Sequence, residues 1–171
     1  MISGEVYVFD TTALIDIYNH FPKQFRRLKR IVSSGAAKIP EGVFREIRRK
    51  TDKLRHYVER WEEEYGFVIN IGRNPKLLSE HSRIELAYGE RVKVGDKIYN
   101  GFWNSPAGRK AADGQLVAIG KVHNYTVVSD DTTIRYACFL ENVQCIGWAE
   151  FARRLGSGTG TNQLEMDLPD S

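Results

Sequence analysis

The chain has 171 residues, of which 42% are hydrophobic and 27% are charged. A domain of this size buries about 70% of the surface of its unfolded chain, and the composition excludes a largely disordered, collagen-like or coiled-coil protein. The 25 Lys and Arg residues against 22 Asp and Glu residues give a net charge of +3, which indicates a nucleic-acid partner only if the basic residues cluster on one surface.

The first 65 residues carry alternating signals for strands and helices. The run EVYVF is β-branched and aromatic and ends in Asp10, where a helix begins. A second helix has apolar residues on one face and basic residues elsewhere, and Gly35 follows its end. The predicted order is strand, helix, helix, strand and one long helix, over residues 5–9, 11–15, 22–33, 37–39 and 41–65.

The second part of the chain continues this alternation after a small inserted hairpin. Two alternating runs flank Gly95 and Asp96, which is the signal for a tight hairpin turn. We predict strands over residues 67–71, 91–94, 97–99, 125–128 and 143–146, and helices over residues 75–88, 109–123, 132–141 and 148–155.

The alternation of strands and helices predicts an α/β fold. Parallel strands need crossover connections, which are normally right-handed helices, so we expect a central parallel sheet with helices on both faces. Residues 1–155 are expected to form a single domain with an insertion at about residues 72–108, and residues 156–171 a flexible tail.

The two cysteines, Cys138 and Cys145, each lie in an apolar stretch and lack CxxC spacing. We therefore expect buried thiols rather than a disulfide. Because no run reaches the 18 or so apolar residues of a membrane span, we expect a cytoplasmic protein without a membrane partner.

Four acids stand where predicted strands end or predicted helices begin. Asp10 and Asp131 follow the apolar runs VYVF and TVVS, whereas Asp113 lies in the first turn of a helix and Glu46 lies one turn into another. Ligands of an open parallel sheet gather outside the carboxyl ends of its strands, so these acids could share one crevice. Each acid also has a plain alternative role, since carboxylates cap helix N-termini and stabilise their dipoles.

Converging carboxylates would suit a hard cation such as Mg²⁺ or Mn²⁺, which prefers oxygen ligands, and would disfavour zinc. A cation of this kind lowers the pKa of a bound water and stabilises the leaving oxygen during attack on phosphorus. Hydrolysis of phosphodiester bonds is therefore the chemistry that these acids predict.

At these residues the sequence resembles the PIN-domain ribonucleases, and among them the small toxins of the VapC kind. The likeness is carried by VYVFDTTALIDIY with Asp10, IPEGVFREI with Glu46, KAADGQLVAIGK with Asp113, and YTVVSDDTTI with Asp131. It implies a Rossmann-like three-layer α/β/α fold with a central parallel sheet, divalent-metal endoribonuclease activity, a homodimer, and an antitoxin protein that blocks the site.

By the same resemblance, Asp10, Glu46 and Asp113 match the acids that hold metal, and Asp131 matches the acid after the fourth strand. Ser129 takes a position that is commonly Thr in the family. The sequence departs from the pattern where Asp130 doubles the fourth acid, where Gly114 replaces the more usual Ala, and in the length of residues 72–108.

Basic residues concentrate in two predicted helices of the first half: Arg26, Arg27, Lys29, Arg30, Arg45, Arg48, Arg49, Lys50, Lys53 and Arg55. They would either bind the RNA backbone or form an ordinary solvated face. Arg109 and Lys110, before Asp113, could meet a scissile phosphate, and we expect Phe102 and Trp103 to be packing residues.

The function that we predict is therefore a Mg²⁺- or Mn²⁺-dependent endoribonuclease that acts on RNA, as the toxin of a toxin–antitoxin pair. One alternative is a phosphatase of the haloacid-dehalogenase type, although the run FDTTA lacks a second Asp two residues after Asp10. The other alternative is a non-catalytic RNA- or protein-binding module whose acids serve only as helix caps.

Overall fold

The centre of the molecule is a parallel β-sheet of five strands, ordered β3-β2-β1-β6-β7. The structure is a computed structural model and describes residues 4–50, 52–89, 91–101 and 111–157. The strands are β1 (Tyr7–Phe9), β2 (Ala37–Pro40), β3 (Val68–Ile69), β6 (Thr126–Val128) and β7 (Cys145–Ile146). The predicted parallel sheet is confirmed.

The central strands are short and buried, and they alternate their side chains between two cores. Tyr7 and Phe9 of β1 pack in one core, whereas Val8 packs in the other. In β6, Val128 and Val127 divide between the same two cores. Side chains of a strand point alternately to opposite faces of the sheet, so strands that are apolar throughout require helices on both faces.

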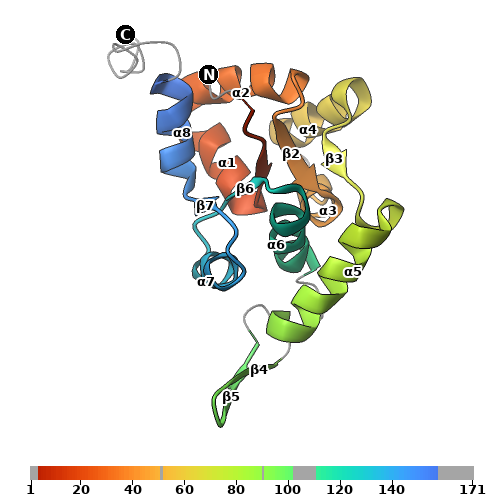
Figure 1. Cartoon of the computed structure of the whole chain (residues 1–171). Helices are drawn as coiled ribbons and strands as arrows, with labels where there is room; N and C mark the ends of the chain where they lie inside the picture. The colour runs from red at the N-terminus through yellow and green to blue at the C-terminus, as the bar shows by residue number, and fades with distance from the viewer. Residues whose placement is uncertain (1–3, 51, 90, 102–110, 158–171) are drawn as a thin grey trace.

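Helices cover the two faces, which confirms the predicted three-layer α/β/α class (Figure 1). The first core contains side chains from α1 (Thr11–His20), α2 (Pro22–Ser33), α3 (Glu41–Arg48), α4 (Lys53–Tyr65) and α8 (Trp148–Ser157). The second core contains side chains from η1 (Ile71–Arg73), α5 (Pro75–Ile84), η2 (Glu85–Gly89), α6 (Ala111–His123) and α7 (Thr132–Leu140).

The predicted long helix over residues 41–65 is wrong, because the structure has two helices there, α3 and α4. The carboxylate of Asp52 accepts a hydrogen bond from the backbone N–H of Arg55 at 3.1 Å and so caps the start of α4. The apolar periodicity continues across the break and conceals it. The predicted helix over residues 75–88 likewise ends its α-helical part at Ile84 and continues as the π-helical turn η2.

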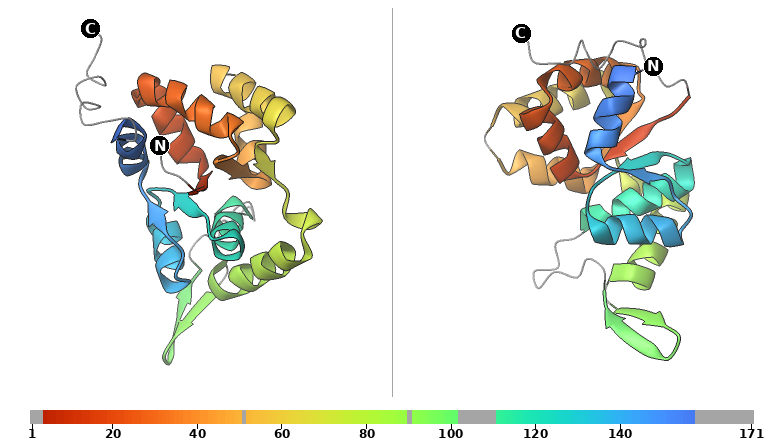
Figure 2. Two further views of the ribbon diagram at one scale, coloured as in Figure 1. Left: turned by 45° about the horizontal axis from the view of Figure 1, so that its top comes forward. Right: turned by 90° about the vertical axis from the view of Figure 1, so that its left-hand side faces the viewer.

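The predicted hairpin is also present. Strands β4 (Arg91–Val94) and β5 (Lys97–Asn100) pair in antiparallel fashion around Gly95, whose φ of 64° favours glycine. The hairpin extends away from the rest of the molecule (Figure 2). Phe102, Trp103, Arg109 and Lys110 lie outside the described residues, as does most of the predicted tail.

The segment before the hairpin is fastened to the end of α7 by Glu141. This carboxylate, on a residue only 9% exposed, accepts hydrogen bonds from Arg83 and Tyr88 and forms an ion pair with Lys121. Burial alone would raise the pKa of Glu141, but its cationic and hydroxyl partners hold that pKa below its ordinary value. The insertion therefore has a charged anchor on the second face of the sheet.

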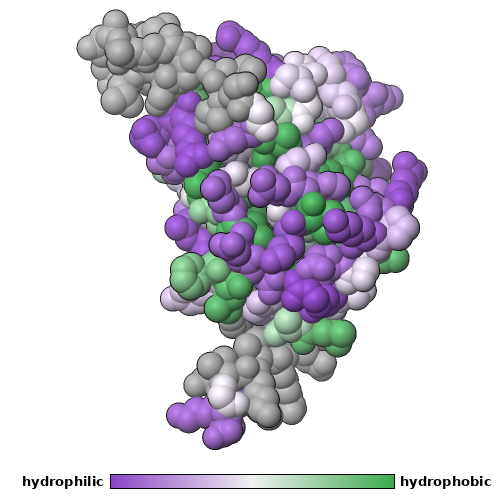
Figure 3. All heavy atoms as spheres, viewed as in Figure 1, coloured by the Kyte–Doolittle hydropathy of each residue, from purple (hydrophilic) through white to green (hydrophobic). Residues whose placement is uncertain are grey.

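Polar side chains cover most of the molecular face shown in Figure 3. A hydrophobic group lies where Figure 1 places α7, whose exposed large residues are Tyr136, Phe139 and Leu140. Among the described helices, none has both the length and the apolar character that crossing a membrane requires.

Candidate active site at the carboxyl edge of the sheet

Asp10 follows the central strand β1 and lies between the ends of β1 and β6. Its backbone N–H donates to the carbonyl of Val128 at 3.0 Å. Phe9 is in register with Val128, so Ser129 follows β6 at the same level of the sheet. The hydroxyl of Ser129 donates to the Asp10 carboxylate at 2.8 Å. The parallel register thus brings an acid and its hydrogen-bond donor together from positions 119 residues apart.

The carboxylate of Asp10 is in an unfavourable place for a negative charge. Burial raises the pKa of Asp10 above its ordinary value, and the neighbouring carboxylates of Asp131 and Glu46 raise this pKa further. The Ser129 hydroxyl and a backbone N–H oppose these effects only in part. An excess of negative charge is therefore concentrated at this point of the sheet edge.

Glu46 reaches the site through the residue that follows Asp10. The hydroxyl of Thr11, which is only 8% exposed, donates to the Glu46 carboxylate at 2.7 Å. Thr11 opens α1 at the end of β1, and Glu46 lies in α3, which follows β2 directly. Because β1 and β2 are parallel neighbours, both helices begin at the same edge of the sheet.

The two adjacent acids after β6 point to different helices. Asp131 caps α7, since its carboxylate accepts hydrogen bonds from the backbone N–H groups of Thr133 and Ile134 at 2.9 and 3.1 Å. Asp130 instead accepts from the backbone N–H of Trp148, the first residue of α8, at 3.2 Å. Both acids are helix caps, and Asp131 is the one whose charge acts on Asp10.

The helix that carries Asp113 is held against the helix that carries Glu46. The backbone N–H of Gly42 in α3 donates to the side-chain oxygen of Gln115 in α6 at 2.8 Å. A Cβ atom at Gly42 would lie 2.9 Å from the backbone of Ala112, so glycine is required for this close approach. The first turns of α3 and α6 therefore meet, with Asp113 in the first turn of α6.

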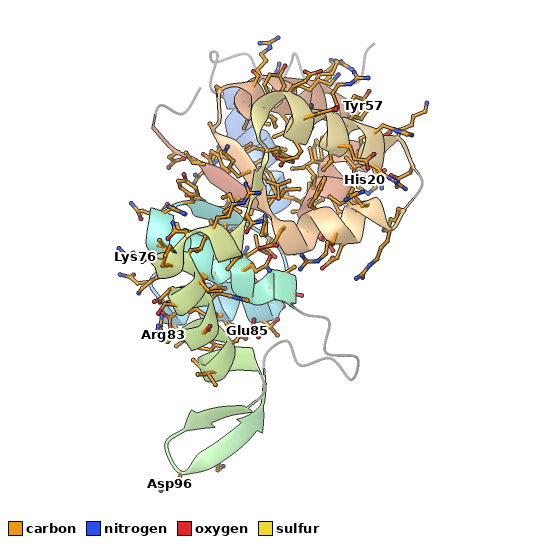
Figure 4. All side chains as sticks on the ribbon, turned by 90° about the vertical axis from the view of Figure 1, so that its right-hand side faces the viewer. His20, Tyr57, Lys76, Arg83, Glu85 and Asp96 are labelled. Carbon is orange, nitrogen blue, oxygen red and sulfur yellow. The ribbon has the colours of Figure 1, made fainter. Side chains whose placement is uncertain are left out.

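A carboxylate from the insertion fills the space beside Gly114, the residue that follows Asp113. A Cβ atom at this position would overlap Oε1 of Glu85. Glu85 begins the π-helical turn η2, at the end of α5 that lies beside α6 (Figure 4). An alanine at this position would require the flexible end of Glu85 to move aside.

Comparison with known proteins assigns the chain to a family. A family model described as "Domain of unknown function (DUF4411)" matches residues 7–158. The chain belongs to the DUF4411 family. No curated protein matches this DUF4411 chain.

Solved structures that resemble this DUF4411 protein include VapBC2 from Rickettsia felis bound to a promoter DNA fragment. The sequence identity is 12% and the TM-score is 0.49, and the match covers 84% of this chain and 98% of that chain. FitAcB from Neisseria gonorrhoeae has 15% identity, coverages of 84% and 99%, and a TM-score of 0.45. PAE2754 from Pyrobaculum aerophilum has 13% identity, coverages of 88% and 96%, and a TM-score of 0.45.

These structures have TM-scores below one half and sequence identities below one fifth, so their likeness carries no argument about the activity of this chain. The function of the DUF4411 chain is therefore inferred from its site.

The donor chemistry of the site fits a hard divalent cation. Asp10, Glu46 and Asp131 offer carboxylate oxygens, and their mutual repulsion at Asp10 is of the kind that a cation relieves. Within residues 4–50, 52–89, 91–101 and 111–157, however, no three His, Cys, Asp or Glu side chains form a group that could hold a metal ion as they stand. The acids fit the cation in charge and donor type without forming a ready-made cage.

Several residues of the site escaped prediction from the sequence. Thr11, Gly42 and Gln115 make the contacts that position the acids, yet none carries a recognisable motif. For Thr11 a signal existed, because a hydroxyl directly after a strand-end acid faces the same edge. The contact between Gly42 and Gln115 joins residues 73 apart, and local patterns hold no information about it.

The basic residues divide into paired and unpaired groups. Arg48 and Arg55 both form ion pairs with Glu59, at 3.3 and 3.4 Å, and Lys29 lies over the ring of Tyr57 at 4.7 Å. Among the basic residues of the two helices singled out from the sequence, those that are exposed and form no ion pair with the described part of the chain are Arg26, Arg30, Arg49, Lys50 and Lys53. Unpaired exposed cations remain available for phosphate groups.

Proposed function

We propose that this protein is a Mg²⁺- or Mn²⁺-dependent endoribonuclease whose site is centred on Asp10. The observation that carries the proposal is the half-buried Asp10 carboxylate, whose pKa is raised by burial and by two neighbouring carboxylates. Burying like charges together costs free energy unless a cation compensates them. A protein that needed Asp10 only as a helix cap would gain nothing from placing further acids beside it.

In this proposal Asp10, Glu46, Asp113 and Asp131 hold the cation. When bound, the cation would lower the pKa of a water and stabilise charge on the scissile phosphate. The hydroxyl of Ser129 keeps the Asp10 carboxylate oriented. Asp131 would contribute through the part of its carboxylate that does not cap α7.

RNA is the proposed substrate because unpaired cations lie next to the acids. Arg49 and Lys50 follow the end of α3, one helical turn after Glu46, and both are exposed. A polyanion bound there would have its backbone beside the carboxylate edge. The cation of the site would then complete the neutralisation of the bound phosphate.

The roles of toxin, antitoxin-binding protein and homodimer are further parts of the proposal, and they rest on the resemblance to VapC-like proteins. A toxin of this kind would arrest growth when expressed alone. Co-expression of the protein encoded next to it would relieve the arrest, and light scattering would measure the oligomeric state. If cells that express an RNA-cleaving protein grow normally, the toxin role is wrong and the nuclease activity alone remains.

The decisive experiment is cleavage of a labelled RNA by purified protein in Mg²⁺, in Mn²⁺ and in chelator. Cleavage is expected only with metal, and Asp10→Asn or Asp113→Asn should abolish it without unfolding the protein. Asp16→Asn is the matched control, because Asp16 is a half-exposed acid in the middle of α1. Cleavage that persists in chelator, or in both site variants, would overturn the proposal.

One observation supports the alternative function of a non-catalytic binding module. Asp130 and Asp131 both cap helices, as structural acids do. A module would bind RNA or protein without cleavage and would not respond to Mg²⁺. Hydrolysis of a small phosphate monoester in place of RNA would instead indicate the phosphatase.

A further inference from the structure

The end of α7 turns back so that two cysteines meet. The backbone N–H of Val143 donates to the carbonyl of Cys138 at 2.8 Å, and that of Asn142 to Phe139 at 3.2 Å. Asn142 has a φ of 59°. These are the two hydrogen bonds and the left-handed residue of a Schellman motif, which ends a helix by reversing the chain. Cys145 follows in β7, two residues beyond the motif.

The reversal places the side chain of Cys145 against that of Cys138. Cys145 packs in the second core, which contains Cys138, whereas its neighbour Ile146 packs in the first. Helix α7, which carries Cys138, packs against β7, which carries Cys145. The two reduced cysteines therefore lie side by side in the second core, and each acts on the acidity of the other.

The two thiols differ in access and in acidity. Cys138 is fully buried, whereas Cys145 is half-buried. The interaction with the Cys138 thiol and the nearby Arg135 guanidinium lower the pKa of Cys145. The same interaction and burial raise the pKa of Cys138. Thiolates rather than thiols attack oxidants, so Cys145 is the better nucleophile of the pair.

We propose that Cys138 and Cys145 are an oxidation site, in which a peroxide converts the two thiols to an intramolecular disulfide. The Cys145 sulfur attacks the peroxide oxygen, which gives a sulfenic acid and releases water when the peroxide is hydrogen peroxide. The Cys138 sulfur then displaces the hydroxyl group as a second water and forms the S–S bond. Two thiols lose two electrons and two protons, and the peroxide is reduced.

The pair adjoins the carboxylate edge through Ser129. The Cys145 thiol donates to the Ser129 carbonyl at 3.8 Å, and the hydroxyl of the same serine holds Asp10. Oxidation removes the hydrogen that the thiol donates. The modification itself requires no assumption about the reaction at Asp10.

The test is treatment of the reduced full chain with hydrogen peroxide, followed by intact mass and peptide mapping without reduction. The expected product has lost two hydrogens, carries a bond between Cys138 and Cys145, and returns to the starting mass with dithiothreitol. Cys138→Ala should stop at a sulfenic acid on Cys145 that a dimedone probe captures. Cys145→Ala should slow oxidation of the remaining thiol by about tenfold or more, because that thiol is buried and protonated.

Far-UV circular dichroism establishes that both variants are folded. Peptide mapping of the oxidised natural chain tests the disulfide without any substitution. Unchanged thiols, disulfides only between two molecules, or equal oxidation rates in both variants would each overturn the proposal.

Discussion

Replacing Asp10 by Asn should increase the stability of the metal-free protein while removing its response to metal. The pKa of Asp10 is raised in the folded state, so the ionised carboxylate opposes folding. The folded state holds the proton of the Asp10 carboxyl more tightly than the unfolded state does. The protonated carboxyl therefore stabilises the fold at pH values below its pKa in the unfolded chain. That contribution is lost as pH rises from the ordinary Asp value of about 3.9 through the folded pKa. Asn keeps a carbonyl acceptor for Ser129 but carries no charge.

The response to metal has the opposite sign. A cation that binds only the folded state, at about 100 times its dissociation constant, stabilises it by about 2.7 kcal/mol. For a chain of this size each kcal/mol raises the melting temperature by about 2–4 °C, so the natural protein should gain about 5–11 °C. Asp10→Asn should lose most of this gain, because Asp10 carries the buried charge that the cation compensates.

Thermal unfolding in chelator and in Mn²⁺, followed at several pH values, measures both effects on the same samples. Asp16→Asn should behave like the natural protein, since its carboxylate lies in the middle of α1. The reasoning is refuted if Asp10→Asn is the less stable protein in chelator above the folded pKa of Asp10, or if it keeps the full response to Mn²⁺.

Two further substitutions test the supports of the site. Asp131→Asn should retain the cap of α7 but weaken the response to Mn²⁺, whereas Asp131→Ala should also lose about 0.5–2 kcal/mol of stability in urea denaturation; equal stability of the two variants would contradict the capping role. Gly114→Ala should change stability by no more than about 1 kcal/mol in the same assay, because the Glu85 carboxylate that the new methyl group meets is the end of a flexible side chain and can move aside; a larger loss would show that this carboxylate is held in place.

The arrangement around Asp10 could be predicted because local and global signals agree there. A run of apolar residues that ends in an acid marks a strand end, and the alternation of elements makes the sheet parallel. The carboxyl edge follows from these two facts. The place of β1 between β2 and β6 follows from neither of these facts. It depends on which strands pair, and the packing of the two cores determines that pairing.

Which helix each of Asp130 and Asp131 caps was beyond prediction for a different reason. Their chemistry is identical, and either can cap a helix. The choice depends on where α8 begins relative to β6, because the N–H of Trp148 is the partner of Asp130. Asp52 supplies a local capping signal at the break between α3 and α4, but the apolar periodicity continues across the break and predicts a single helix.

The position of β1 inside the sheet also determines which part of the molecule opens last. Its backbone is hydrogen-bonded on both sides, with Tyr7 donating to Ala36 and Asp10 donating to Val128. Within the described residues, β4 and β5 pair only with each other, and isolated two-stranded hairpins are marginally stable. Amide hydrogens of β1 should therefore exchange with solvent only through global unfolding, whereas those of the hairpin exchange through local opening. The carboxylate edge would persist while the inserted arm frays.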